Sequence, residues 1–256
     1  IDDDKNGFVD DVYGWNFLGE AYYEQLELTR LLGKGEDFPE KEDAQKDYDK
    51  RLAEARGEET LKYYLNYDFK GRTTGDDQDN IEQTYYGDNK VEHSREDESH
   101  GTHVAGIIAA VRNNNLGMKG VANNVEIMTL RVVPYGDEYD KDVALGIIYA
   151  ADNGADIINT SFGKGYSPHK DWVWDALRHA EKNDVLIVNA AGNSGANIDP
   201  GMKKTFITDE DSGEEIVSNF LTVGSSSSEY NQEQISVFSN YGMVNVDLFA
   251  PGDKIW

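Results

Sequence analysis

The sequence contains no cysteine among its 256 residues. A disulfide framework and a thiolate site are therefore excluded, which is compatible with export. Long apolar runs are also missing: the longest, such as VAGIIAAV and VALGIIYAA, are far shorter than the roughly 20 residues that cross a bilayer as a helix. No signal peptide is visible. We therefore expect no membrane span in this chain.

Basic residues are scarce, because 24 Lys and Arg stand against 49 Asp and Glu, for a formal charge of −25. A nucleic-acid partner would require a basic patch, so this balance argues against one. It favours a well-hydrated protein that tolerates salt or binds cations. Hydrophobic residues make up 38% of the chain, which at this length is enough for one large domain with a sizeable core.

The stretch from about residue 20 to 95 is charged and helical in pattern. Residues 20–98 contain 23 acidic and 12 basic side chains. Four residues at helical spacing predict an amphipathic helix: Ala44, Tyr48, Leu52 and Ala55. Tyr23, Leu26 and Arg30 suggest an earlier one. We interpret this stretch, called the insertion below, as a solvated surface element without chemistry of its own.

From Ser99 onward, predicted strands and helices alternate. Helices are predicted over 100–111, 139–154 and 170–184, and strands over 125–133, 155–162, 185–191, 220–226 and 244–250. Short apolar strands that alternate with helices indicate a three-layer α/β/α fold with a mainly parallel central sheet. In such sheets function gathers at the carboxyl ends of the strands.

Polar residues follow two of these strands and begin one helix. Asn159 and Ser161 lie in INTSFG, and Asn193 lies in NAAGNSG. His100 follows Ser99, a potential N-cap, and the helix dipole would keep its imidazole neutral, as a general base requires. From the spacing of His100 and His103 alone, a structural histidine is the more common reading. No third ligand, HExxH motif or cysteine cluster supports a zinc site.

Four motifs in order resemble the subtilisin-like serine proteases (the subtilase or peptidase S8 family): HGTHVAG, INTSFG, AAGNSG and SVFSNYG…VDLFAPG. The resemblance covers residues 99–256, and DDDKNGFVDDVYGWNF is also common in the family. It implies that residues 1–256 are a partial peptidase S8 catalytic domain of three-layer α/β/α fold, truncated at both ends. The insertion resembles those of subtilases from Bacteroidota.

The resemblance implies roles for individual residues. His100 matches the general base, His103 a structural neighbour, and Asn193 the side-chain donor of the oxyanion hole. One wall of the pocket for the residue before the scissile bond matches Ser161, Phe162 and Gly163, and the other matches Ala190, Ala191 and Gly192. The strand that pairs with substrate as an added β-strand matches Gly136, Asp137 and Glu138.

Two motifs of the family are not in this sequence. The catalytic aspartate belongs to an apolar strand ending D-[ST]-G, expected upstream of DDDKNG, and the nucleophilic serine to a GTSMA-like motif, expected downstream of APG. The one DSG, Asp211–Ser212–Gly213, lies in a charged stretch far after the histidine, and we reject it. We therefore expect a fragment that is inactive alone.

For the parent protein the resemblance implies a secreted or cell-envelope endopeptidase that acts on peptides or proteins through an acyl-enzyme and is made with a propeptide. Two alternatives stay open: a non-catalytic pseudoprotease or peptide-binding scaffold, and a calcium-binding structural module. We also hypothesise that Asp137, Glu138 and Glu98 form acidic walls that favour basic substrate residues.

One stretch has the spacing of a calcium loop. DDDKNGFVDD places four oxygen-bearing residues at loop positions 1, 3, 5 and 9, namely Asp2, Asp4, Asn6 and Asp10, with Gly7 at position 6. Tyr13 replaces the bidentate glutamate at position 12, so a solvated Asp/Asn-rich turn is the alternative. In RNNNLGMKG, Asn114 resembles a ligand in the family's calcium loop after the histidine helix. Structural calcium is thus a possible cofactor.

Overall fold

Four parallel strands build the main sheet of the computed structural model, which describes residues 2, 4–92, 99–202, 205–229 and 234–255. Their order is β3 (Ile157–Thr160), β4 (Leu186–Ala190), β7 (Phe220–Ser226) and β8 (Leu248–Pro251). Each of these strands was expected from an apolar run, because both faces of a parallel sheet are covered. The expected α/β fold with mainly parallel sheets is confirmed.

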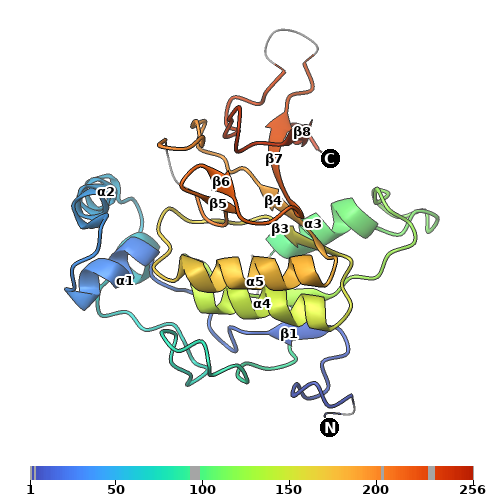
Figure 1. Cartoon of the computed structure of the whole chain (residues 1–256), viewed down its shortest axis with the longest axis horizontal. Coiled ribbons are helices and arrows are strands. Elements are labelled where there is room, and N and C mark those ends of the chain that lie inside the picture. The colour runs from blue at the N-terminus through green and yellow to red at the C-terminus, as the bar shows by residue number, and fades with distance from the viewer. Residues whose placement is uncertain (1, 3, 93–98, 203–204, 230–233, 256) are drawn as a thin grey trace.

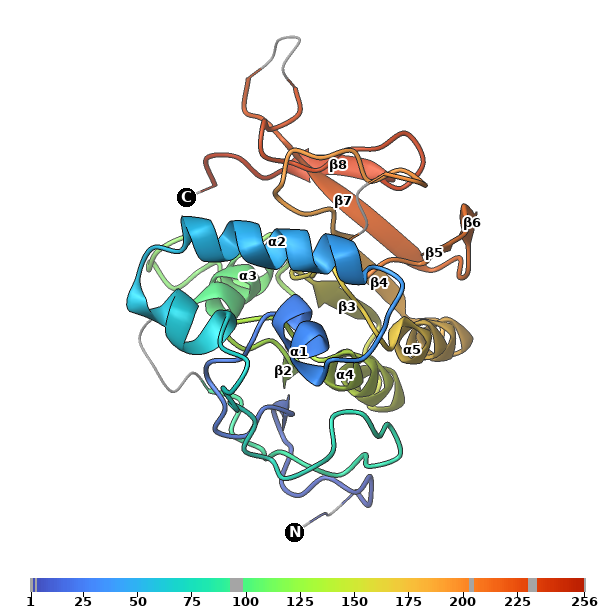
Figure 2. The same cartoon turned by 90° about the vertical axis from the view of Figure 1, so that its left-hand side faces the viewer.

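Two helices pack together on one face of this sheet, α4 (Asp140–Asp152) and α5 (Lys170–Lys182) (Figure 1). Val143 and Ile147 of α4 meet Leu177 of α5 above Ile187 and Phe220 of the sheet, all of them buried. Helix α3 (His100–Ala109) lies on the opposite side of the sheet (Figure 2). None of the residues of α3 is buried, so this third layer is thinly packed.

A separate pair of parallel strands consists of β1 (Gly14–Asn16) and β2 (Thr129–Arg131). The predicted strand over 125–133 is therefore shorter than expected. Val125 and Ile127 are exposed, because only the last part of that run has a partner strand within the described residues. Gly14 has φ 120°, and a Cβ there would lie 2.0 Å from the Thr129 carbonyl oxygen, so only glycine allows this pairing.

The insertion contains α1 (Glu27–Lys34), α2 (Lys41–Glu54) and a short π-helical turn (Thr60–Tyr64), followed mainly by loop. Helices α1 and α2 pack through a small core of Leu28, Ala44, Tyr48 and Leu65. The predicted stripe is confirmed for Ala44 and Tyr48, whereas Leu52 is 44% exposed.

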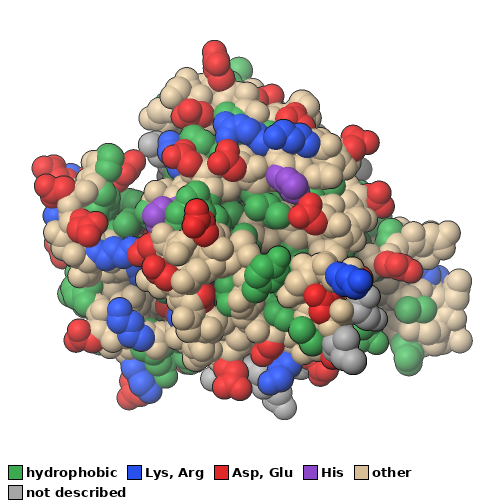
Figure 3. Space-filling view, turned by 60° about the horizontal axis from the view of Figure 1, so that its bottom comes forward, with side chains coloured by type: hydrophobic (Ala, Val, Ile, Leu, Met, Phe, Trp, Pro, Cys, Tyr) green, Lys and Arg blue, Asp and Glu red, His purple; other side chains and the backbone are tan. Residues whose placement is uncertain are grey.

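The rejected DSG motif lies in a surface hairpin between β5 (Glu210–Asp211) and β6 (Glu214–Glu215). Ser212 has φ 57° and Gly213 has φ 92°, as a two-residue hairpin turn requires. Acidic side chains are scattered over the face shown in Figure 3 rather than gathered in one patch. Among the helices of the described residues, none is both long and apolar enough to cross a bilayer.

Candidate active site

The strand register brings two of the predicted substrate-binding segments together. Strands β3 and β4 are parallel, and Thr160 is aligned with Asn189. The Thr160 hydroxyl donates a 2.8 Å hydrogen bond to Asn189 Oδ1, and both residues are buried. Segments 161–163 and 190–192 therefore begin at the same edge of the sheet. Their role as pocket walls stays a prediction.

Asn240 holds the loop that carries Asn193. Its Oδ1 accepts hydrogen bonds from the backbone N–H groups of Ser194 (3.0 Å) and Ala196 (3.1 Å), and its Nδ2 donates to the Ala191 carbonyl (2.7 Å). Asn240 is only 1% exposed. The sequence offered SVFSNYG as a motif but no role for its asparagine, because this partnership joins segments more than 40 residues apart.

Asn193 and His100 are both exposed. His100 is the first residue of α3 and follows Ser99, which is the N-cap by position but makes no side-chain capping bond. Within the described part of the chain, the imidazole of His100 makes no hydrogen bond. His103 is exposed as well, so it does not contribute the packing that was expected of it.

The predicted substrate strand 136–138 is paired with the insertion. Glu24 N–H donates to the Tyr135 carbonyl (2.7 Å), and Asp137 N–H donates to the Gln25 carbonyl (3.2 Å). Gly136 has φ 134°, and a Cβ there would lie 2.1 Å from the Glu24 carbonyl oxygen. The glycine is thus required by close approach of the insertion backbone.

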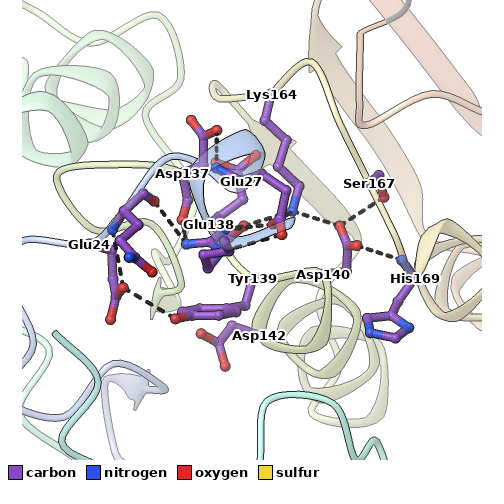
Figure 4. A network of polar contacts seen from close by, with 12 residues as sticks. Glu24, Glu27, Asp137, Glu138, Tyr139, Asp140, Asp142, Lys164, Ser167 and His169 are labelled. Atoms are coloured by element: carbon purple, nitrogen blue, oxygen red, sulfur yellow. Dashed lines mark hydrogen bonds and ion pairs between the residues drawn. The ribbon is translucent and has the colours of Figure 1, made fainter. Parts of the chain in front are cut away.

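This segment adjoins a network of charged side chains that includes Glu27 and Lys164 (Figure 4). Burial alone would raise the pKa of Glu27, but Arg30 and Lys164 outweigh it and lower that pKa to about 2. Burial raises the pKa of Glu138 to about 7, against the attraction of Lys164. The site therefore contains both a firmly ionised and a readily protonated carboxyl group.

The hypothesis of acidic substrate walls is wrong for Glu138, which is 3% exposed. One oxygen of the Asp137 carboxylate accepts a hydrogen bond from the Glu27 N–H (2.8 Å) at the start of α1. A carboxylate at a helix N-terminus is favoured there by the helix dipole. The Asp137 carboxylate thus bonds to the insertion, and Glu98 lies outside the described residues.

The first candidate calcium loop is held partly by its own side chains. Asp4 Oδ1 accepts from Asn6 N–H (3.1 Å), Asp2 Oδ2 accepts from Gly7 N–H (3.1 Å), and Asn6 Oδ1 accepts from Phe8 N–H (2.7 Å). Asp2 Oδ1 is buried without a hydrogen-bond partner, as a ligand oxygen for a cation would be.

The remaining candidate ligands add no cluster to this loop. Asp10 is exposed, and Asn114 Oδ1 accepts from the Leu116 N–H (3.0 Å) in its own exposed loop. Across the described residues, no three His, Asp or Glu side chains are grouped as metal ligands. Calcium binding stays a prediction.

A pocket of about 450 Å³ lies between the insertion and the start of α4. Four of its charged side chains are paired with one another: Lys34 with Asp79 at 2.6 Å, and Arg72 with Asp76 at 2.8 Å. None of the predicted catalytic residues lines it, so we place the candidate site at the sheet edge instead.

Several known proteins are similar to this chain in sequence. The model of the subtilase family matches residues 40–255. A thermophilic serine proteinase of Bacillus sp. (strain AK1) is 37% identical over 158 residues, which are 61% of this chain and 35% of that protein. Thermitase of Thermoactinomyces vulgaris is also 37% identical over 158 residues, 61% of this chain and 50% of that protein. The chain thus spans half or less of these relatives.

Among solved structures, MycP1 with its N-terminal propeptide removed is similar to this chain. The similarity has a TM-score of 0.50 at 27% identity and covers 62% of this chain and 54% of that one. It agrees with the mixed α/β architecture and the mainly parallel sheets seen here.

Proposed function

Because the chain belongs to the subtilase family, we propose that it is part of a serine endopeptidase that hydrolyses peptide bonds through an acyl-enzyme. In this proposal His100 takes the proton of a serine nucleophile and returns it to the leaving amine. Asn193 donates to the oxyanion of the tetrahedral intermediate. The serine and the aspartate that orients His100 would come from outside this chain.

The observation that carries the proposal is the register of β3 and β4. Because Thr160 is aligned with Asn189, segments 161–163 and 190–192 both begin at the carboxyl edge of a parallel sheet, where ligands of α/β proteins bind. Asn193 follows directly, in a loop fixed by Asn240. A carbonyl between the two segments would meet an amide donor from the second.

The chain alone is expected to be inactive, because a site without nucleophile and orienting aspartate keeps only weak residual stabilisation. Two features support this. The His100 imidazole has no hydrogen-bond partner among the described residues. Strands β2 and β3 belong to different sheets, which leaves an edge of each for a further strand.

The remaining expectations concern the whole protein. We propose that it acts on peptides or proteins and works outside the cytoplasm, as a secreted or envelope-bound enzyme. A propeptide belongs to the proposal, and the removal of one from MycP1 supports it. The low density of basic residues supports the absence of a nucleic-acid partner.

Labelling with a fluorophosphonate probe tests the proposal in the intact protein that contains this chain. We expect labelling of one serine, and loss of most labelling in His100→Ala. His103→Ala is the matched control, because it removes an exposed histidine from the same helix, and it should label normally. Full labelling of His100→Ala would contradict the role of His100, and an unlabelled wild type that still binds peptide would favour the scaffold.

A further inference from the structure

Arg30 of the insertion clamps the predicted substrate strand by its backbone. One guanidinium nitrogen, Nη1, donates to the Asp137 carbonyl (2.9 Å), and the other, Nη2, donates to the Glu138 carbonyl (3.1 Å). Nη2 also donates to Glu27 Oε2 at 2.6 Å. The guanidinium lies 4.0 Å from the ring centre of Tyr139. Two successive peptide carbonyls are thus held by one side chain.

The same network reaches the other predicted substrate segment through Lys164, which follows Gly163 directly. Its Nζ donates to the Glu138 carbonyl (2.8 Å) and lies 2.7 Å from Glu27 Oε2. Glu27 therefore bridges Arg30 and Lys164, and the Glu138 carbonyl accepts from both cations. The distance between segments 136–138 and 161–163 is set by these contacts.

The clamp depends on the shape of the guanidinium as well as on its charge. The Arg30 and Lys164 side chains are 7% and 2% exposed, so water cannot replace a lost contact. A planar fork with five donors can serve two carbonyls and a carboxylate together, whereas an ammonium group has three donors at one point. Arg30→Lys would keep the positive charge but could not donate to both carbonyls and to the Glu27 carboxylate in the same arrangement.

The clamp leaves the backbone of Gly136 unpaired. The Asp137 N–H bonds to Gln25 of the insertion, whereas Gly136 before it has φ 134° and lies in a bend. Among the described residues, none bonds to the N–H or C=O of Gly136. The Glu138 carbonyl already accepts two bonds, so an added peptide would pair at Gly136.

We propose that Arg30 and Glu27 are positioning residues, which hold segment 136–138 against Lys164 so that the unpaired backbone of Gly136 is presented to an extended peptide. This inference rests on the proposed function. It gives the insertion a task in the recognition of substrate residues away from the scissile bond. The hydrolysis of a substrate that occupies only the predicted pocket at residues 161–163 and 190–192 would not depend on Arg30.

The test compares two substrates of the intact protein: a peptide with four residues before the scissile bond and a single-residue ester. In Arg30→Lys we expect kcat/KM for the peptide to fall about tenfold to a hundredfold, because small misplacements of a binding segment are costly. The ester and fluorophosphonate labelling should change by less than about twofold. Equal losses on both substrates, or no loss on either, would overturn the inference.

Arg72→Lys is the matched control. Arg72 is also an arginine of the insertion, its side chain is 9% exposed, and it binds Asp76 and Asp142 without touching residues 136–138. It should keep the wild-type ratio of peptide to ester activity. A ratio shifted as in Arg30→Lys would mean that general loosening of the insertion is the cause, and would overturn the inference.

If the wild type neither labels nor cleaves, the proposed function fails. Binding of the labelled peptide then decides: weaker binding by Arg30→Lys than by Arg72→Lys keeps the inference, and equal or absent binding overturns it.

Discussion

Asn240 Oδ1 lies 3.0 Å from the backbone nitrogen of Ser194 and accepts its hydrogen bond. The same oxygen accepts from Ala196, and the amide nitrogen donates to the Ala191 carbonyl. One buried side chain therefore satisfies three backbone groups of this loop, in addition to backbone hydrogen bonds such as that from the Gly195 N–H to the Phe238 carbonyl. Asn193, the proposed oxyanion donor, is held between these contacts.

Asn240→Ala should destabilise the fold and weaken catalysis. It leaves two N–H groups and one carbonyl without partners, which costs about 2–4 kcal/mol in the free energy of unfolding. Since Asn193 would be held less firmly, kcat of the intact protein should fall more than KM rises. Denaturant unfolding and steady-state kinetics measure the two effects.

Asn183→Ala is the control for Asn240→Ala, because Asn183 is exposed and its side chain donates to one helix-end carbonyl, that of His179. It should cost less than about 1 kcal/mol and leave kcat unchanged. A kcat that stays at the wild-type value in Asn240→Ala would show that this loop does not position the donor.

Glu138 should make the protein less stable as the pH rises. Its pKa is raised from 4.5 to about 7 in the folded state, so between these values the folded chain binds a proton that the unfolded chain has released. Stability therefore falls through this window. Glu138→Gln removes the free-energy cost of ionising this buried carboxyl group. At pH 8 the free energy of unfolding of the variant should therefore exceed that of the wild type by at most about 3 kcal/mol, with little difference at pH 4.

Glu27→Gln should show the opposite pH dependence. The pKa of Glu27 is lowered to about 2, so its stabilisation is present above pH 4.5 and is lost as the pH falls toward 2. The variant should be less stable than the wild type at pH 7 and approach it in acid. Urea unfolding curves across pH 3–8 measure both variants, and parallel profiles would refute the assignment of Glu138.

The sequence was sufficient for the elements whose stability is local. Helices α4 and α5 follow from apolar residues on one face, such as Val143 and Ile147 of α4, and the strands of the main sheet follow from short apolar runs. Strand β2 was predicted too long, because an apolar run says nothing about how much of it finds a partner strand.

The contacts of the site were less predictable because they join distant segments. Gly136 and Glu138 match the family's substrate strand, and the sequence did not show that both also contact the insertion. A Cβ on Gly136 would collide with the Glu24 carbonyl, and the Glu138 carbonyl accepts from Arg30. The insertion was expected to be a solvated surface element. The helical spacing included Arg30, but no periodicity reveals that Arg30 and Glu27 form a buried ion pair that anchors the insertion.

Calcium should raise the melting temperature if the first acidic loop binds it. Asp2 Oδ1 is buried and unpartnered, and a cation would satisfy it. At a hundredfold excess over Kd, binding to the folded state would contribute about 2.7 kcal/mol. Melting curves in millimolar calcium and in chelator measure the effect, which should shrink in Asp4→Asn.

Asn114→Ala distinguishes the two candidate calcium loops, because it changes only the second one. If calcium still raises the melting temperature of Asp4→Asn but not that of Asn114→Ala, the calcium site lies in the second loop. A melting temperature that does not respond to calcium in the wild type would leave the first loop as a solvated turn.

The buried ion pair between Arg72 and Asp142, a second anchor of the insertion, should contribute more to the free energy of unfolding than any ion pair on its surface. Arg72 binds Asp142 through two nitrogens at 2.8 and 2.9 Å, and Asp142 is 0% exposed. Arg72→Met leaves that carboxylate buried with less compensation, which costs about 3–5 kcal/mol. Arg51→Met removes an exposed pair with Asp47 on α2 and should cost less than about 1 kcal/mol. Equal losses in denaturant unfolding would show that the insertion is not anchored through Asp142, because burial is what separates the two pairs.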